Sequence, residues 1–491
     1  MYSGSGYSDW EIGDITIFRH QGVYHLFHLI IPNHDYIAHA VSGDGLSWTR
    51  TKNALFVGDP GEWDDDMLWT MHVFASNNKF LMYYTGLRRE DRGTVSKIGM
   101  AESDDLIHWR KIQGHGLPVE ISGDIYEHKN DNPRGWLSFR DPFYIEHMGA
   151  VYVLFCGRIN SGPISRRGCV GLMKREKEHF VFKKPLVHPM VYDDVECPCI
   201  FQLNNRFYVI GSIREDIKVR YWMTDRFLGE YQSFHSDVLL PQGNYAARVL
   251  QDENHLLIYN FFYTNGHINS LRVLPPPKEL SADHTGRLIL KSFYRWEQMV
   301  EQEIKQEDFA SPERILKNPT ALFERGKNEW VCSSKGGYEI FYMPRPSYNF
   351  IWEGKLCNST LGKFGLVTHI DQEGNGYFIS FDLIEGLIQL RSWGYNPSNN
   401  RENFIFNNIQ TNVCIVPQSG SIWFKLICYG NYIELSVDDE VKITLMDYAW
   451  SGPGLGLYTA SSSITLQDSV IKILPDLVSE YASQELANKA H

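Results

Sequence analysis

The chain has 491 residues, which is too long for one simple hydrophobic core, so we expect two domains. The formal net charge is -12, and no run of Lys and Arg forms a basic stripe, so nucleic acid and anionic membranes are poor partners. An uncharged ligand fits this charge balance better. No stretch has the apolar length of a membrane span.

The N-terminus and the cysteines bear on location and cofactors. The start, Met1 to Gly4, lacks the charged and apolar regions of a signal peptide, so we expect a cytoplasmic protein or a secreted one already trimmed. The eight cysteines are scattered, and the 197–199 Cys-Pro-Cys triplet has the wrong spacing for zinc, which favours free buried thiols. We predict no metal and no cofactor. The oligomeric state stays open, a homo-oligomer included.

The first part of the chain repeats one pattern. Helical periodicity is almost missing, and short apolar runs alternate with Gly, Asn and Asp turns. Five hairpins recur at roughly fifty-residue spacing, each with a polar start followed by an apolar strand. Their first strands are expected at 13–18, 68–74, 139–143, 196–201 and 244–250, and their second strands at 24–27, 80–84, 151–155, 207–210 and 256–259. This pattern predicts a five-bladed β-propeller over residues 1–275, whose five polar strand starts converge near a central axis.

The repeat ends at three prolines, Pro275 to Pro277. We interpret residues 276–318 as a connector with a short helix at 296–305. From residue 319, strands with a different spacing predict a β-sandwich over residues 319–475. The polar tail, 476–491, is expected to be a frayed helix or disordered. The predicted fold class is therefore all-β, a propeller followed by a sandwich.

Three of the five polar strand starts carry carboxylates: Asp14, Asp141 and Glu196. Cleavage of a glycosidic bond requires a pair of carboxylates, one acting at the anomeric carbon and one protonating the leaving oxygen. A separation of about 5–5.5 Å between the pair is typical of a retaining enzyme. We expect Arg140 to keep Asp141 ionised, and the less polar surroundings of Glu196 to raise its pKa toward that of a general acid. The alternative for each acid alone is a structural role in a turn or ion pair.

Two of these stretches resemble signature motifs of glycoside hydrolase family 32, the invertase, inulinase and levanase family. They are Phe139-Arg140-Asp141-Pro142 and Glu196-Cys197-Pro198. Residues 279–281 and 286–288 resemble the family's connector after the fifth blade, and residues 433–437 resemble part of its C-terminal sandwich. The resemblance covers nearly the whole chain. It implies a propeller followed by a sandwich, and a retaining reaction on β-fructofuranosides such as sucrose, fructooligosaccharides or fructans.

The resemblance also implies residue roles. By position, Asp14 would be the nucleophile, Glu196 the acid/base, and Asp141 the transition-state stabiliser with Arg140 beside it. The family's first motif has Asn before and Pro-Asn after the nucleophilic Asp, whereas Asp14 follows a glycine and precedes Ile-Thr. Its Trp-Ser-Gly stretch corresponds only loosely to residues 68–70. Because these neighbours normally shape the sugar subsite, another furanose, such as an arabinofuranoside, stays open.

Four further residues are candidates for substrate binding. Trp69 and Tyr245 either stack on a sugar ring or pack inside a blade. Asp35 and His39 follow the first hairpin and are candidates for hydrogen bonds to sugar hydroxyls, although a lone histidine is more often packed.

Three functional hypotheses remain from the sequence. The first is a retaining β-fructofuranosidase. The second is a transferase that uses the same acids to pass the sugar to another sugar or to its own hydroxyl, which gives an oligosaccharide or a difructose anhydride. The third is a carbohydrate-binding propeller without catalysis.

Overall fold

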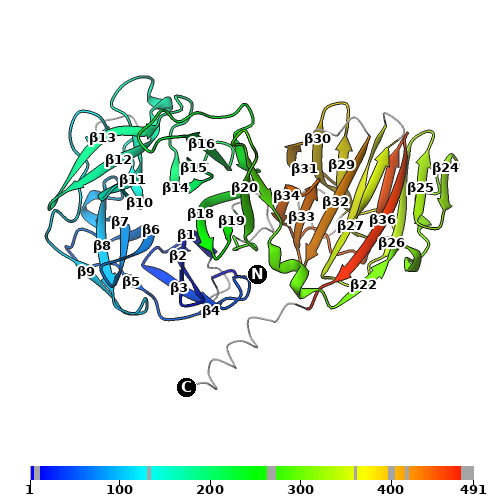
Figure 1. The fold of residues 1–491 in the computed structure, drawn as a ribbon, viewed down its shortest axis with the longest axis horizontal. Coiled ribbons are helices and arrows are strands. Elements are labelled where there is room, and N and C mark those ends of the chain that lie inside the picture. The colour runs from blue at the N-terminus through cyan, green and yellow to red at the C-terminus, as the bar shows by residue number, and fades with distance from the viewer. Residues whose placement is uncertain are drawn as a thin grey trace, which may run out of the picture. The chain divides into compact units, whose positions relative to one another are not determined.

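The computed structural model describes residues 2–4, 11–129, 134–262, 272–358, 362–395, 404–414 and 420–476. Among them, strands dominate, and the helical elements are four short 3-10 helices: η1 (Arg89–Asp91), η2 (Ile164–Arg166), η3 (Tyr294–Met299) and η4 (Gln306–Asp308). The chain divides into two compact units, with the division between Ile289 and Leu290 (Figure 1). None of the described helices has the length and apolar character needed to cross a membrane.

The first domain contains five antiparallel sheets arranged around a common centre (Figure 1). In chain order they are β1 (Glu11–His20), β2 (Val23–Ile31), β3 (Tyr36–Ser42), β4 (Thr49–Arg50) and β5 (Leu55–Phe56); β6 (Met67–Ser76), β7 (Lys79–Leu87), β8 (Ser96–Ser103) and β9 (Trp109–Ile112); β10 (Phe139–His147), β11 (Ala150–Arg158), β12 (Gly168–Glu176) and β13 (His179–Val187); β14 (Glu196–Leu203), β15 (Arg206–Ile213), β16 (Lys218–Thr224) and β17 (Val238–Leu240); β18 (Asn244–Asp252), β19 (His255–Phe262), β20 (Lys278–Ala282) and β21 (Leu288–Lys291). The first strands contact one another in order, and β18 contacts β1, so the ring closes. The predicted five-bladed propeller is confirmed.

Apolar side chains from neighbouring blades meet in continuous clusters. Phe27 and Leu29 of the first blade pack with Leu68, Met71 and Tyr84 of the second, and all five are buried. A second cluster joins the second and third blades in the same way. Each large apolar side chain buried in this way contributes about 1.5–3 kcal/mol. These seams fix the blades against one another and therefore fix where their first strands begin.

The fifth blade extends beyond its predicted end. Strands β20 and β21 continue the sheet that begins with β18 and β19, and Ile258 of β19 pairs with Lys278 of β20. The prolines at 275–277 interrupt the chain before β20, because they lack backbone N–H groups, but they do not end the sheet. The predicted domain end at residue 275 is therefore corrected to about Ile289, and the first part of the predicted connector belongs to the propeller.

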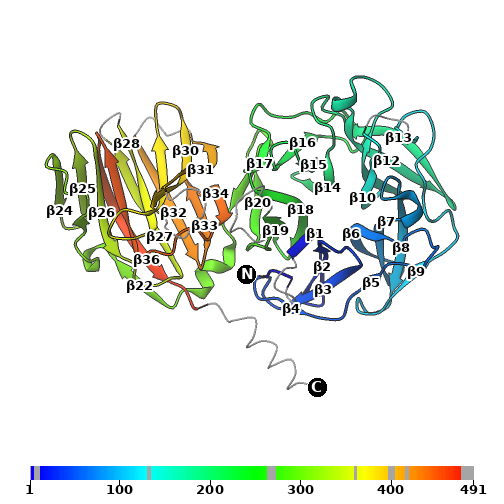
Figure 2. The same cartoon turned by 180° about the vertical axis from the view of Figure 1, so that it is seen from behind.

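The second domain is a two-sheet β-sandwich, as predicted (Figure 2). One sheet contains β24 (Ala321–Arg325), β25 (Glu329–Ser334), β36 (Ser463–Ile473), β27 (Phe350–Asn358), β32 (Ser421–Tyr429), β33 (Tyr432–Val437), β34 (Glu440–Met446) and β22 (Gln302–Lys305); the other contains β23 (Glu313–Arg314), β26 (Tyr338–Pro344), β35 (Gly454–Ala460), β28 (Lys363–Ile370), β29 (Gly376–Asp382), β30 (Leu387–Tyr395) and β31 (Phe404–Val413). Trp352 and Phe424 from the first sheet and Leu366 and Tyr377 from the second are buried in one core.

The predicted helix at 296–305 is only partly present. The helical residues are Tyr294–Met299, while Gln302–Lys305 form strand β22, which pairs with β36. Pairing with a sheet edge satisfies the backbone groups of this segment, so tertiary context overrides the helical periodicity. Of the predicted tail, residues 477–491 lie outside the described part of the chain.

Candidate active site

All five innermost strands carry a β-bulge near their start, and the three predicted acids lie at or beside these bulges. The pairing register shifts between Ile12 and Ile15 in β1, Trp69 and Met71 in β6, Arg140 and Phe143 in β10, Glu196 and Cys199 in β14, and Tyr245 and Arg248 in β18. A bulge sets two residues against one and turns the strand, which redirects a side chain. Asp141 and Cys197 have φ values of 60° and 50°, a strained region for non-glycine residues that concentrates at functional sites.

Hydrogen bonds from neighbouring blades hold the first two acids in place. The Thr70 hydroxyl of the second blade donates to Oδ2 of Asp14 in the first. The backbone N–H of Cys197 in the fourth blade donates to Oδ2 of Asp141 in the third at 2.8 Å. One carboxylate oxygen of Asp14, one of Asp141 and the sulfur of Cys197 all lie within 4.8 Å of one another. Asp141 is buried, whereas Asp14 is partly exposed.

Glu196 completes the cluster from the start of β14. Its Oε1 accepts a hydrogen bond from Nη2 of Arg140 at 2.6 Å, and its Oε2 accepts one from the Tyr245 hydroxyl at 2.5 Å. The Glu196 side chain is 14% exposed, so a ligand can reach it. Tyr245, a candidate for stacking on a sugar or packing inside a blade, is buried and contacts the acid. Burial raises the pKa of its hydroxyl well above the ordinary value. The hydroxyl therefore stays protonated and acts as a donor.

Arg140 pairs differently from the prediction. Its Nε lies 3.8 Å from Oδ2 of Asp141, whereas its Nη2 lies 2.6 Å from Glu196 and 3.0 Å from Oδ2 of Asp194. Arg140 therefore bridges the acid of β14 and a second carboxylate just before that strand. Asp141, its neighbour in the sequence, is the most distant of the three carboxylates.

Burial raises the pKa of all three acids. For Asp14, burial and the charge of Glu196 outweigh the hydrogen bond from Thr70. For Asp141, burial raises the pKa and the charge of Arg140 lowers it, so Arg140 favours the ionised form as expected while burial acts more strongly in the opposite direction. For Glu196, burial also outweighs Arg140, and the pKa rises in the direction expected for a general acid.

Two other predicted substrate-binding residues lie at different depths. Trp69 is partly exposed at the start of β6, beside Thr70, and its indole Nε1 has no hydrogen-bond partner among the described residues. Asp35 lies on the exposed turn between β2 and β3, where its carboxylate accepts a hydrogen bond from the amide of Asn33 at 3.2 Å. Within the described structure, Asp35 makes no contact with the three acids.

The prediction that His39 binds a sugar is wrong. Its side chain is fully buried in β3, where the ring stacks on Phe27 with a centroid distance of 4.3 Å. Its Nε2 lies 3.0 Å from Nδ1 of His25. Burial lowers the pKa of His39 to about 3, so the ring is neutral and belongs to the blade core.

The structure adds site residues that sequence reasoning missed. Thr70 and Asp194 bond directly to the cluster, and Arg158, the last residue of β11, donates to Asp194 at 2.8 Å. The ring of Trp136 lies against the guanidinium groups of Arg140 and Arg158, with distances of 5.0 and 4.2 Å to the centroid. A signal for Asp194 was present in the sequence, since two adjacent acids directly precede the Val-Glu-Cys-Pro run.

The grouping of Asp14, Asp141 and Cys197 also has the spacing of a metal site. Burial raises the pKa of the Cys197 thiol well above its ordinary value, so the sulfur stays protonated. Because a metal ligand must be a thiolate, an ion bound here would have to displace the thiol proton.

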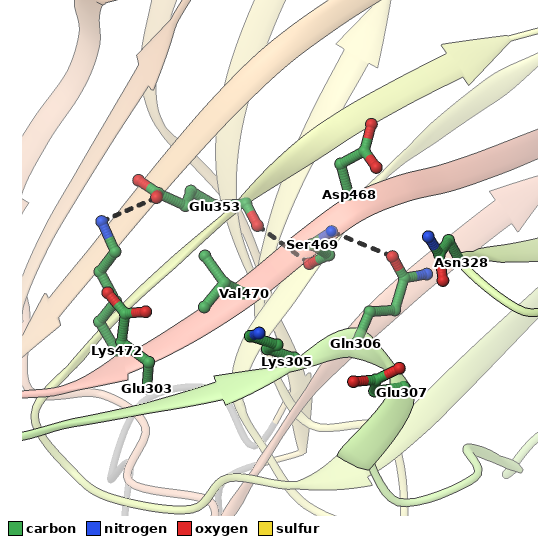
Figure 3. A pocket seen from close by; sticks show the side chains of 10 residues that line it. All are labelled: Glu303, Lys305, Gln306, Glu307, Asn328, Glu353, Asp468, Ser469, Val470 and Lys472. Atoms are coloured by element: carbon green, nitrogen blue, oxygen red, sulfur yellow. Dashed lines mark hydrogen bonds and ion pairs between the residues drawn. The ribbon is translucent and has the colours of Figure 1, made fainter.

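A separate hollow of about 490 Å³ lies in the sandwich domain (Figure 3). Part of its polar lining holds strands together: Lys472 pairs with Glu353 at 2.8 Å, and Gln306 accepts a hydrogen bond from the backbone of Ser469 at 3.0 Å. Three of the four acids that line it are exposed, unlike the acids at the strand starts of the propeller, so the propeller carries the candidate active site.

An all-β chain that brings three acids to the centre of a five-bladed propeller, followed by a sandwich, has the architecture of a glycoside hydrolase. The sequence model described as the glycosyl hydrolases family 32 N-terminal domain matches residues 15–266, which is more than half of the chain. The chain belongs to glycoside hydrolase family 32 and is a fructosidase-type enzyme. The match begins one residue after Asp14.

Solved structures share this fold at low sequence identity. Sucrose-6-phosphate hydrolase from Lactobacillus gasseri is 16% identical, with a TM-score of 0.69 over 95% of this chain and 91% of that one. Fructan 1-exohydrolase IIa from Cichorium intybus is 14% identical, with a TM-score of 0.68 over 95% of each chain. A family 32 β-fructofuranosidase from Bombyx mori is 16% identical, with a TM-score of 0.64 over 95% of this chain and 91% of that one. No curated protein sequence matched the chain.

Proposed function

We propose that this protein hydrolyses β-fructofuranosides with retention of configuration, by a double displacement at the centre of the propeller. The observation that carries the proposal is the convergence of Asp14, Asp141 and Glu196 from three blades, two of them reachable by a ligand and one buried between blades. Cleavage of a glycosidic bond by this route needs a nucleophile and a separate proton donor.

In the first step, a carboxylate oxygen of Asp14 forms a bond to the anomeric carbon while the glycosidic C–O bond breaks. Glu196 gives its proton to the leaving oxygen, and the aglycone departs as an alcohol. The charge of Glu196 raises the pKa of Asp14, so a proton on Glu196 favours an ionised Asp14. The Thr70 hydroxyl further favours the ionised nucleophile and fixes its orientation.

In the second step, Glu196 takes a proton from water, and the water oxygen attacks the anomeric carbon. The bond to Asp14 breaks, and the sugar leaves with its original configuration. Asp141 is fixed by the Cys197 N–H and lies beside Asp14, which suits it to accept hydrogen bonds from sugar hydroxyls and to stabilise positive charge on the ring.

The similar structures support fructofuranosides as the substrate class. The family member from Bombyx mori was solved with sucrose, and the enzyme from Cichorium intybus was solved with 1-kestose. The proposal for this chain covers the shared fructosyl group and leaves the leaving group open.

The test is a screen of the purified protein against sucrose, 1-kestose, inulin, levan and 4-nitrophenyl β-fructofuranoside. NMR identifies which anomer of the sugar is released first. We expect release of β-fructofuranose from at least one of them. Release of the opposite anomer would contradict the double displacement, and no turnover of any fructoside would contradict the substrate class.

One observation favours a second candidate, a furanose other than fructose. The residue before Asp14 is Gly13, and a Cβ atom there would lie 2.9 Å from Cβ of Leu29 and 3.0 Å from Cδ1 of Ile31. The asparagine that the resembled motif carries at this position would collide with those side chains. The subsite beside the nucleophile is therefore built differently, and 4-nitrophenyl α-arabinofuranoside belongs in the same screen.

A further inference from the structure

Asp194 lies two residues before Glu196 and is enclosed by donors. Its Oδ1 accepts a hydrogen bond from the Ser138 hydroxyl at 2.9 Å. Its Oδ2 accepts one from Arg140 at 3.0 Å and one from Arg158 at 2.8 Å. The side chain is 1% exposed, so no substrate touches it. Of these three donors, Arg140 also contacts the proposed acid, Glu196.

The nitrogen that contacts Asp194 is also the nitrogen that contacts Glu196. Nη2 of Arg140 lies 2.6 Å from Oε1 of Glu196 and 3.0 Å from Oδ2 of Asp194, so two carboxylates share one guanidinium edge. A guanidinium paired with Glu196 alone would strongly favour the carboxylate form, because an opposite charge at this distance lowers a carboxyl pKa by about 1–3 units. A general acid needs the opposite, a proton that is retained until the leaving oxygen departs.

We propose that Asp194 is a positioning residue that holds the Arg140 guanidinium and offsets its charge, so that Glu196 keeps the proton it donates to the leaving group. The inference rests on the proposed role of Glu196 as the acid/base. The electrostatics agree in direction: burial raises the pKa of Glu196, Arg140 lowers it, and the charge of Asp194 raises it. The other groups that face Glu196 are Asp141, which raises the pKa, the Tyr245 hydroxyl, which lowers it, and the Arg214 guanidinium, 4.0 Å from Oε1.

The geometry distinguishes this role from simple anchoring of the blade. Arg140 already has a second fixed contact, because its Nη1 donates to the Ser138 hydroxyl at 2.7 Å. Asp194 adds a negative charge against the same nitrogen that faces Glu196. Arg158, bonded to the same oxygen of Asp194, draws part of that charge away from Arg140. Removal of Asp194 should therefore lower the pKa of Glu196, and removal of Arg158 should raise it.

The test compares the pH dependence of kcat/KM for Asp194→Asn and the wild-type protein, with sucrose and with 4-nitrophenyl β-fructofuranoside. We expect the alkaline limb, which reports the acid in the free enzyme, to move to lower pH by about one unit or more. At pH values above the wild-type alkaline limb, this shift lowers kcat/KM with sucrose roughly tenfold. The nitrophenyl substrate should lose less than about twofold, since its leaving group departs without protonation.

Two variants complete the design. Arg158→Gln should move the alkaline limb to higher pH, and it carries the test alone if Asp194→Asn does not fold by circular dichroism. Glu127→Gln is the matched control, because Glu127 is a buried carboxylate bonded to Arg134 at 3.2 Å and Arg167 at 2.8 Å, without contact to Arg140. We expect its limbs to coincide with those of the wild type.

The inference would be overturned if the alkaline limb of kcat/KM is unchanged in both Asp194→Asn and Arg158→Gln. Equal losses of kcat/KM with both substrates would also overturn it and leave Asp194 with a structural role. Failure of the proposed function gives a different result. The wild-type protein would then cleave neither substrate, or Glu196→Gln would retain wild-type activity with sucrose.

Discussion

The hydroxyl of Thr70 in the second blade donates a hydrogen bond to the carboxylate of Asp14 in the first. Thr70 itself is buried and occupies the bulge of β6, so the bond joins two blades at the centre of the propeller. A donor at this position favours the ionised form of Asp14 and fixes its direction. The nucleophile therefore depends on a residue more than fifty positions away in the chain.

Replacing Thr70 with Val removes this hydrogen bond while preserving the shape of the side chain. We expect kcat/KM to fall roughly 10- to 100-fold, since a hydrogen bond to a charged group contributes about 1.5–3 kcal/mol. The pKa of Asp14 rises when the donor is lost, so the acidic limb of kcat/KM should move to higher pH. Thr70→Ser, which keeps the hydroxyl, is the control. A Val variant with an unchanged acidic limb would contradict the assignment of that limb to Asp14.

Asp14→Asn tests the nucleophile directly. We expect kcat to fall by at least about 10⁴-fold, as in other enzymes that lose a nucleophilic group, while circular dichroism and the thermal midpoint stay near those of the wild type. Asp44→Asn is the control in the same blade: Asp44 accepts hydrogen bonds from Leu46 and Ser47 in a turn, so its loss affects stability and not turnover. Wild-type activity in Asp14→Asn would assign the nucleophile elsewhere.

Tyr245→Phe tests the second partner of Glu196. The Tyr245 hydroxyl lowers the pKa of Glu196, so its removal should raise that pKa and move the alkaline limb of kcat/KM to higher pH. Tyr208→Phe provides the control, since the Tyr208 hydroxyl donates to the carbonyl of Gly286 at 3.0 Å and not to an acid. An alkaline limb that moves to lower pH in Tyr245→Phe would contradict this arrangement.

Much of the fold could be predicted from local sequence. The first two strands of every blade are short apolar or alternating runs joined by short turns. One such turn lies at Asn204 and Asn205, whose φ values of 50° and 62° suit asparagine. These signals involve neighbours in the chain. Residues 263–277 separate β20 from β19, so no short hairpin marks β20 and β21 as part of the fifth blade, and the sequence pattern places them in a connector instead.

The acids of the site could be predicted, but not their partners. Asp14, Asp141 and Glu196 each mark the start of an apolar strand, which is a local feature. The strongest contacts of Arg140 are with Asp194 and Glu196 on the next blade, and only the closed ring of strands brings these residues together. The prediction for His39 fails because its burial depends on packing against Phe27 and His25 of the adjacent strand β2, which its own sequence neighbours do not reveal.

Three buried histidines in the first blade should make the stability of the protein depend on pH. Burial lowers the pKa of His25 to about 4 and of His28 and His39 to about 3, from an ordinary value of 6.5. At pH values between these lowered pKa values and 6.5, the unfolded chain binds more protons than the folded chain. The free energy of unfolding is therefore highest, with respect to these histidines, above pH 6.5 and falls as the pH decreases toward 4. We expect a loss of several kcal/mol over this range, measured by urea unfolding at each pH.

His39→Gln checks both this prediction and the placement of His39 in the core. The variant removes one titrating ring but keeps a polar group for His25, so the free energy of unfolding should fall at pH 7 by about 1–3 kcal/mol and depend less steeply on pH. KM should stay within about twofold of the wild type, because the fully buried ring cannot reach a sugar. His108→Gln, at an exposed histidine, is the control for the slope. A large rise in KM for His39→Gln, without a change in the slope, would return His39 to the substrate site.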